Sequence, residues 1–232
     1  MRKKQLSNPN NTTKLFYGKY TYRLSVYCVV ASIFRNKDFN YAKYKLDSWN
    51  QDVGDGRVPQ LGIYGTGDSI PISELHLALK LLNIFKTAPT EFTLRIEGRT
   101  LNIFSNDITW LTQVETLLGE SALELIGPKN SKIAEYLLKN PKHQLAIFKG
   151  FRYKVKTKFV RKDCSSFGSW CQNVKGVKIS KQFQKELLED SYLSEGRNIY
   201  VKDEKTLNIV TLLIGEGIQS ITYLVDPNEL DI

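Results

Sequence analysis

The feature that most constrains this chain is an internal repeat. The segment 102–120, NIFSNDITWLTQVETLLGE, returns at 198–216 as NIYVKDEKTLNIVTLLIGE, without a gap and at a constant offset of 96 positions. Each copy reads as a strand, an aspartate that can cap the next helix, an apolar stripe at helical spacing, and a glycine that ends the helix. An ungapped match of this quality indicates duplication. The matched pairs include Asp107/Asp203, Leu111/Leu207, Val114/Val210, Gly119/Gly215 and Glu120/Glu216.

The duplication extends toward the N-terminus of each copy. Tyr20 to Leu24 alternates like a half-buried strand and matches Phe151 to Val155 at an offset of 131 positions. The difference between the two offsets corresponds to residues 35–72, a glycine-rich insertion in the first copy. We expect a long loop there, with a short helix at residues 41–49, that is irregular or binds a partner. A nucleotide loop is disfavoured because no Gly-Lys-Ser/Thr ending follows the glycines.

Both copies predict the order strand, helix, strand, strand, helix, strand. This order is similar to the ferredoxin-like βαββαβ unit, which implies an α+β protein with antiparallel sheets and helices on one face. In the second copy, we expect the first helix at 180–189 and a weakly marked second strand near Tyr192. The predicted organisation is a flexible basic arm (1–15), a first unit (16–130), a linking helix (131–147) and a second unit (148–232).

Charge indicates the class of partner. The 232 residues carry a formal net charge of +9, which favours an anionic partner, with nucleic acid ahead of a membrane surface. No apolar run is long enough to span a membrane, and the N-terminal MRKKQLSNPNNTTK lacks the apolar core of a secretory signal. We therefore expect a cytoplasmic protein, in the host cytoplasm if it is viral. Cys28, Cys164 and Cys171 are odd in number and are expected to be free thiols rather than zinc ligands or disulfides.

Strand alternation separates core residues from the uncovered sheet face. The sets Phe92/Leu94/Ile96, Leu101/Ile103 and Ile199/Val201 should face the helices. The opposite face then carries basic side chains and one aromatic ring in each copy, on the third strand. Bases could stack on these rings while lysines and arginines neutralise phosphates. The predicted nucleic-acid-binding residues are Arg23, Tyr27, Arg95, Asn102 and Phe104, together with Arg152, Lys154, Lys156, Lys158, Asn198 and Tyr200; Thr93 shares the first face.

This layout resembles the RNA-recognition-motif domains in its arrangement, and it implies binding of single-stranded RNA or DNA. Neither third strand carries the Lys/Arg-Gly-aromatic-Gly-aromatic run of that family, so its base-reading residues do not carry over. The alternative is that both sheet faces are buried, by the arm, by the insertion, or by the two copies packing together. Phe104 and Tyr200 would then be core residues.

Two further functional classes stay open. The duplicated basic chain also looks like the CRISPR-associated RAMP endoribonucleases, a resemblance that implies RNA cleavage without metal, with His76 and Lys80 as candidate catalytic residues. The segment TLRIEGRTLNIFSND looks like bacteriophage proteins, which suggests an assembly part with a protein partner or self-association. Binding rather than catalysis is the prediction, with no cofactor and no metal site.

Overall fold

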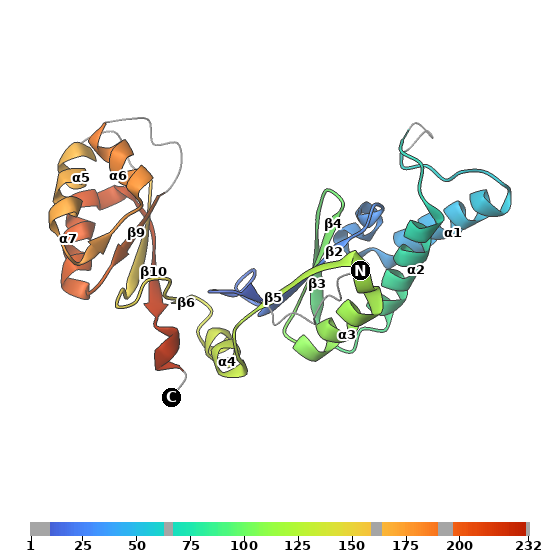
Figure 1. Ribbon diagram of the computed structural model, residues 1–232, viewed down its shortest axis with the longest axis horizontal. Helices are drawn as coiled ribbons and strands as arrows, with labels where there is room; N and C mark the ends of the chain where they lie inside the picture. Colours follow the sequence, from blue (N-terminus) through green and yellow to red (C-terminus); the bar gives the residue numbers. More distant parts are fainter. Residues whose placement is uncertain (1–9, 63–66, 159–163, 190–196, 231–232) are drawn as a thin grey trace. The chain divides into compact units, whose positions relative to one another are not determined.

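The computed structural model describes residues 10–62, 67–158, 164–189 and 197–230. The chain divides into two compact units, residues 1–134 and 135–232. Each unit combines α-helices with a five-stranded, mainly antiparallel sheet (Figure 1). The predicted α+β class is confirmed at this level.

The first unit has the sheet order β1-β5-β2-β4-β3. Its hairpin β3–β4 turns at Gly98, whose positive φ of 60° suits glycine. Asp38 and Asp107 cap α1 and α3 by accepting hydrogen bonds from the backbone N–H of Tyr41 and Trp110, both at 2.9 Å. The elements are β1 (Asn10–Asn11), β2 (Tyr22–Tyr27), η1 (Ala31–Lys37), α1 (Phe39–Gly54), α2 (Ile72–Lys86), β3 (Phe92–Glu97), β4 (Thr100–Ser105), α3 (Ile108–Leu118), η2 (Gly119–Ser121) and β5 (Ala122–Gly127).

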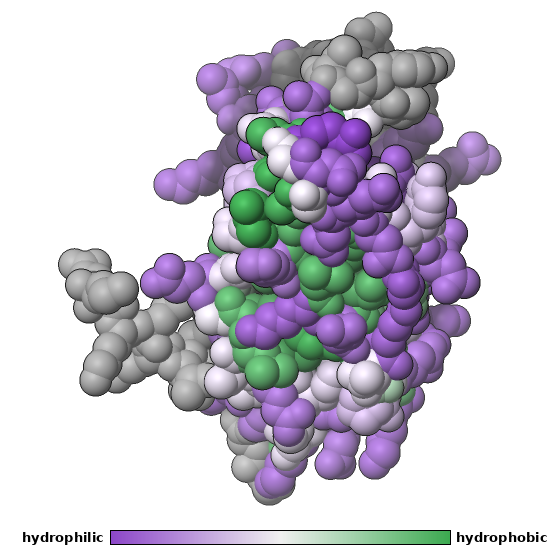
Figure 2. Space-filling model, turned by 90° about the vertical axis from the view of Figure 1, so that its right-hand side faces the viewer, coloured by the Kyte–Doolittle hydropathy of each residue, from purple (hydrophilic) through white to green (hydrophobic). Residues whose placement is uncertain are grey.

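The helices of the first unit pack on one face of its sheet. Leu24, Leu101 and Ile103 are fully buried in one cluster with the helical residues Leu46, Leu81 and Leu111, as the strand alternation predicts. Figure 2, which looks onto the side of the molecule where α1 and α2 lie, shows apolar surface broken up by hydrophilic side chains. The helix layer is therefore apolar toward the sheet and mixed toward solvent.

The prediction of a long loop at residues 35–72, with a short helix at 41–49, is wrong in part, because apart from Asp38 only the described residues from Asp55 to Pro71 form neither a helix nor a named strand. The structure places η1 there and then α1, which runs from Phe39 to Gly54 and is much longer than the predicted helix. Ala42, Leu46 and Trp49 are buried at helical spacing against the same core. Gly54 and Gly56 mark the end of a helix instead of a loop, which is why glycine density misled the prediction.

The second unit has the sheet order β6-β10-β7-β9-β8. Along the chain, its edge strand β8 follows α5 and precedes α6. The helix predicted at 180–189 corresponds to α6, which is therefore preceded by α5 and is not the first helix after β7. The predicted strand near Tyr192 lies outside the described residues. The elements are α4 (Ser131–Lys139), in which the unit boundary falls, then β6 (Gln144–Leu145), β7 (Tyr153–Thr157), α5 (Cys164–Asn173), β8 (Val177–Lys178), α6 (Lys181–Leu188), β9 (Arg197–Val201), α7 (Glu204–Ile214), η3 (Gly215–Gly217), β10 (Ile218–Val225) and η4 (Pro227–Glu229).

The sequence offsets reappear in the strand registers. Arg23 pairs with Phe104 in the first unit, and Lys154 pairs with Tyr200 in the second. The strand pair β2–β5 has a register shift between Ser25 and Val26. The equivalent pair of the second unit, β7–β10, has a register shift at the matching place, between Ile218 and Ser220. Gly119 and Gly215 both end their helices at positive φ, 58° and 55°. The two similar sequence segments therefore lie in strands that pair in the same way in both units.

The predicted boundaries of the arm and the linker need correction. Asn10–Asn11 form β1, parallel to β5, and Leu15 is buried, so this part of the predicted arm belongs to the first unit. Residues 1–9 lie outside the described residues. The linking helix is α4, and it is followed by β6, which pairs parallel to β10. Each sheet thus gains a short parallel strand that alternation did not predict.

Buried cysteines give each unit its own probe of unfolding. Burial raises the pKa of the Cys28 and Cys171 thiols to about 12 in both cases. At pH near 8, we expect iodoacetamide to label these thiols about a thousandfold more slowly than a free cysteine, because only the thiolate reacts. Mass spectrometry of a Cys164→Ser chain, with and without urea, measures this. Fast labelling of native protein would contradict the prediction.

Candidate nucleic-acid interface

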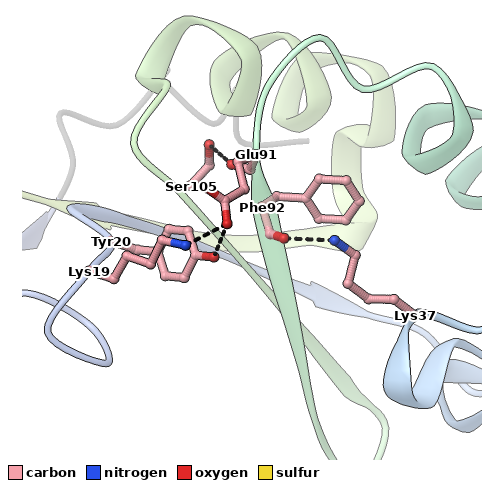
Figure 3. A network of polar contacts seen from close by, with 6 residues as sticks. All are labelled: Lys19, Tyr20, Lys37, Glu91, Phe92 and Ser105. Carbon is pink, nitrogen blue, oxygen red and sulfur yellow. Dashed lines mark hydrogen bonds and ion pairs between the residues drawn. The ribbon is translucent and has the colours of Figure 1, made fainter.

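In the first unit, the predicted binding face is closed by the segment before β2. Phe104 on β4 is only 4% exposed, and its ring lies 5.4 Å from Phe16 and 5.0 Å from Tyr17, centroid to centroid. We call residues 12–20 the N-terminal strap. Its end is held at the start of β3, where Lys19 Nζ lies 2.5 Å from Glu91 Oε1 (Figure 3). Phe104 is therefore a buried residue covered by the strap, which is the alternative that the sequence left open for this face, and it is not available to stack a base.

The other predicted residues of the first face are engaged within the unit. Arg23 lies 3.5 Å from Glu124 and over the Phe16 ring, and Arg95 Nε lies 2.8 Å from Glu97. Asn102 is 3% exposed and accepts a hydrogen bond of 2.7 Å from Ser25 Oγ. Tyr27 is exposed, and a hydrogen bond between it and Arg99 helps to raise the pKa of that guanidinium. Phe104 and Asn102 are therefore buried and Arg23 is paired, while Arg95 and Tyr27 stay exposed at this face.

The second unit presents the matching face differently. β7 and β9 bring Lys154 beside Tyr200 and Lys156 beside Asn198 in register. Lys156, Lys158 and Asn198 are exposed, while Lys154 and Tyr200 are half-buried. Alternate residues of a strand are about 6.5 Å apart on one face, so the three lysines form a cationic row. The structure thus brings five of the six predicted residues of this copy together.

Two residues of this surface were not predicted from the sequence, Phe148 and Lys178. Phe148, which precedes β7, lies with its ring 4.9 Å from that of Tyr200 at an interplanar angle of 85°. Lys178, on β8, places Nζ 3.7 Å from the centre of the Phe148 ring. A signal for Phe148 was present, because Phe16-Tyr17-Gly18 and Phe148-Lys149-Gly150 both precede a first strand, and Gly18 and Gly150 both have positive φ. Residues 148, 154, 156, 158, 178, 198 and 200 are called the lysine face below.

The acidic residue that balances the first face is missing from the lysine face. Glu124 pairs in register with Ser25 in the first unit, and its counterpart Ser220 pairs with Lys156. Among the described residues, no carboxylate forms an ion pair with Lys156 or Lys158. Burial raises the pKa of the Tyr200 hydroxyl, so this ring stays neutral near pH 7. The surface therefore offers net positive charge beside an uncharged aromatic pair.

Arg152 is the predicted residue of the second unit that is held in an ion pair. Its guanidinium makes a two-pronged ion pair with Glu229 of η4, with N–O distances of 2.8 and 2.6 Å. This pairing raises the pKa of Arg152. Arg152 therefore attaches the C-terminal η4 turn to the start of β7 and is not counted in the lysine face.

The candidate nuclease residues do not form a catalytic arrangement. His76 is exposed on α2, and the ammonium of Lys80, one turn further on, donates to the Leu117 carbonyl at the end of α3. That contact satisfies a free carbonyl of the last helical turn. The chain's other histidine, His143, is half-buried with Nδ1 2.7 Å from the Tyr136 hydroxyl. Neither histidine lies on a predicted binding strand.

No metal centre is evident in the described part of the chain. The acidic residues of the insertion are paired with arginines, Asp52 and Asp55 with Arg57 and Asp68 with Arg99, at 2.7 to 2.8 Å. Within residues 10–62, 67–158, 164–189 and 197–230, no three histidine, cysteine or acidic side chains are grouped as metal ligands. The helices of these same ranges are too short or too polar to cross a bilayer.

Comparison with protein-family models, curated proteins and solved structures finds no match for this chain. The candidate site therefore depends on geometry and charge alone.

Proposed function

We propose that the chain consists of two copies of a ferredoxin-like unit and binds single-stranded nucleic acid through the lysine face of the second copy. The shared strand order, the shared register shift and the repeated Phe-x-Gly segment support the duplication. In the second copy, we interpret β8 as the counterpart of β3, displaced to a position before α6. The first copy would then be a stabilising domain whose own sheet face is closed by its strap.

The observation that carries the binding proposal is the lysine row beside the Phe148–Tyr200 pair, in which Lys156 and Lys158 are exposed and form no ion pair with a described carboxylate. Cationic side chains at strand spacing can follow a phosphate backbone, and each neutralised phosphate contributes through the release of counterions. The aromatic pair can stack a base, which contributes about 1 to 3 kcal/mol per base. The same chemistry suits RNA and DNA, so the proposal names single-stranded nucleic acid as the class.

A binding series tests this proposal. Fluorescence anisotropy with labelled single-stranded RNA and DNA of one sequence should show an affinity that falls steeply as salt is raised. We expect Tyr200→Ala to weaken binding by about tenfold through lost stacking. Tyr27→Ala is the matched control, because it removes an exposed tyrosine from the first unit. Binding that is insensitive to salt, or weakened equally by both substitutions, would refute the lysine face as the site.

A further inference from the structure

The outer edge of the first sheet has backbone groups without partners. β3 is the edge strand and pairs only with β4. The two-residue turn at 98–99 makes Glu97 and Thr100 a hydrogen-bonded pair, so the N–H and C=O groups of Leu94 and Ile96 point away from β4. No hydrogen bond from another described segment reaches the backbone of these two residues. This part of the strand can therefore accept another strand.

A cavity runs beside this free edge. Its volume is about 460 Å³, and it lies between η1 and β3. One wall comes from the edge strand and the other from a cationic corner at the end of η1. The lining residues are Arg35, Asn36, Lys37, Thr93, Leu94 and Ile96.

The cationic corner is held in an unusual backbone conformation. Asn36 and Lys37 have φ values of 60° and 57°, which non-glycine residues adopt at a cost in conformational energy. Lys37 Nζ donates to the Phe92 carbonyl at 2.8 Å and lies 4.0 Å from the centre of the Phe92 ring (Figure 3). Lys37 therefore occupies the first outward carbonyl of β3 and leaves the edge open from Leu94 onward.

Charge indicates what can bind in the cavity between η1 and β3, which is called the groove below. Arg35 is exposed, and no carboxylate of the described residues forms an ion pair with it. We propose that the groove takes an extended acidic peptide of a partner protein as an added strand, with a carboxylate at Arg35. The peptide backbone would pair with Leu94 and Ile96, and its side chains would enter the cavity. A nucleic-acid strand lacks the alternating donors and acceptors that this edge requires.

Selection from a phage-displayed library of random octapeptides tests the proposal with the whole chain immobilised. We expect the enriched peptides to contain aspartate or glutamate and to lack proline. One enriched peptide, labelled with fluorescein, should bind Arg35→Glu at least about tenfold more weakly than wild type, because attraction becomes repulsion. Leu94→Pro should weaken binding similarly, because the backbone group that it removes is an N–H that points outward. It also removes a side chain that packs on the core of the first unit, so its folding is checked separately.

The controls separate this groove from the lysine face and from general loss of charge. Lys129→Glu reverses an exposed cation that precedes α4, and it should leave peptide binding unchanged. Circular dichroism should show that each variant is folded, and single-stranded RNA should not displace the peptide. Enriched peptides that bind both groove variants as tightly as wild type would overturn the proposal. So would an absence of enrichment, or a dimer of the chain that Leu94→Pro dissociates.

Discussion

Replacing Lys156 and Lys158 together by glutamate is expected to lower the affinity for single-stranded RNA or DNA by about 100-fold at low salt. Both side chains are exposed, and neither forms an ion pair with a described carboxylate. The substitution removes two cations that would neutralise phosphates and adds two repelling charges at the centre of the lysine face. The slope of log affinity against log salt should also fall by roughly 0.7 for each phosphate that is no longer neutralised. Anisotropy titrations over a salt series measure both effects.

A matched double variant shows whether position or total charge is responsible. Lys181 and Lys185 lie exposed on α6, whose buried residues Phe183 and Leu187 face the core. Lys181→Glu with Lys185→Glu changes the net charge by the same amount, away from the lysine face. We expect it to weaken binding only a fewfold, through the general field of the protein. If the two double variants weaken binding equally, the affinity reflects overall charge and the proposed face is wrong.

Replacing Arg197 by methionine is expected to destabilise the second unit by about 3 kcal/mol. Glu186 on α6 is 9% exposed and receives two bonds from the Arg197 guanidinium, Nε at 2.9 Å and Nη2 at 2.6 Å. Removing the guanidinium leaves a largely buried carboxylate without its countercharge. Urea denaturation followed by labelling of Cys171 reports on this unit, and labelling of Cys28 should not change.

The control for Arg197→Met is a substitution on α6, the helix that carries Glu186. Lys185 makes an exposed ion pair with Glu189 at 3.8 Å, so Lys185→Met should change stability by no more than about 0.5 kcal/mol. Adding Glu186→Leu to Arg197→Met should restore most of the stability, because no buried charge then remains. Equal effects of Arg197→Met and Lys185→Met would show that the buried pair contributes no more than a surface pair.

Much of the secondary structure could be read from local pattern. The capping aspartates Asp107 and Asp203 and the helices that follow them were predicted near their observed positions. These features depend on neighbours within a few residues, which a sequence displays directly. The helix α1 was underestimated because glycines at its end were given more weight than the stripe of Ala42, Leu46 and Trp49.

The candidate site was only half predictable. Alternation correctly put Phe104 and Tyr200 on the strand face that points away from the helices, yet it could not show what covers that face. Phe16 seals Phe104 across 88 positions of sequence, and Phe148 packs on Tyr200 across 52. Lys178 joined the surface because β8 pairs with β9, where the prediction had placed a strand near Tyr192.

By itself, the sequence determined the similarity of segments 102–120 and 198–216, many of the helical and extended segments, and the excess of positive charge. Tertiary structure alone decided that one sheet face is closed and has Arg23 paired with Glu124, while the matching face of the second unit has Ser220 at that place and exposes Lys156 and Lys158. The physical reason is the separation in sequence between the residues that each kind of interaction joins. Capping and periodicity act between near neighbours, whereas burial and ion pairing depend on segments that meet only when the chain has folded.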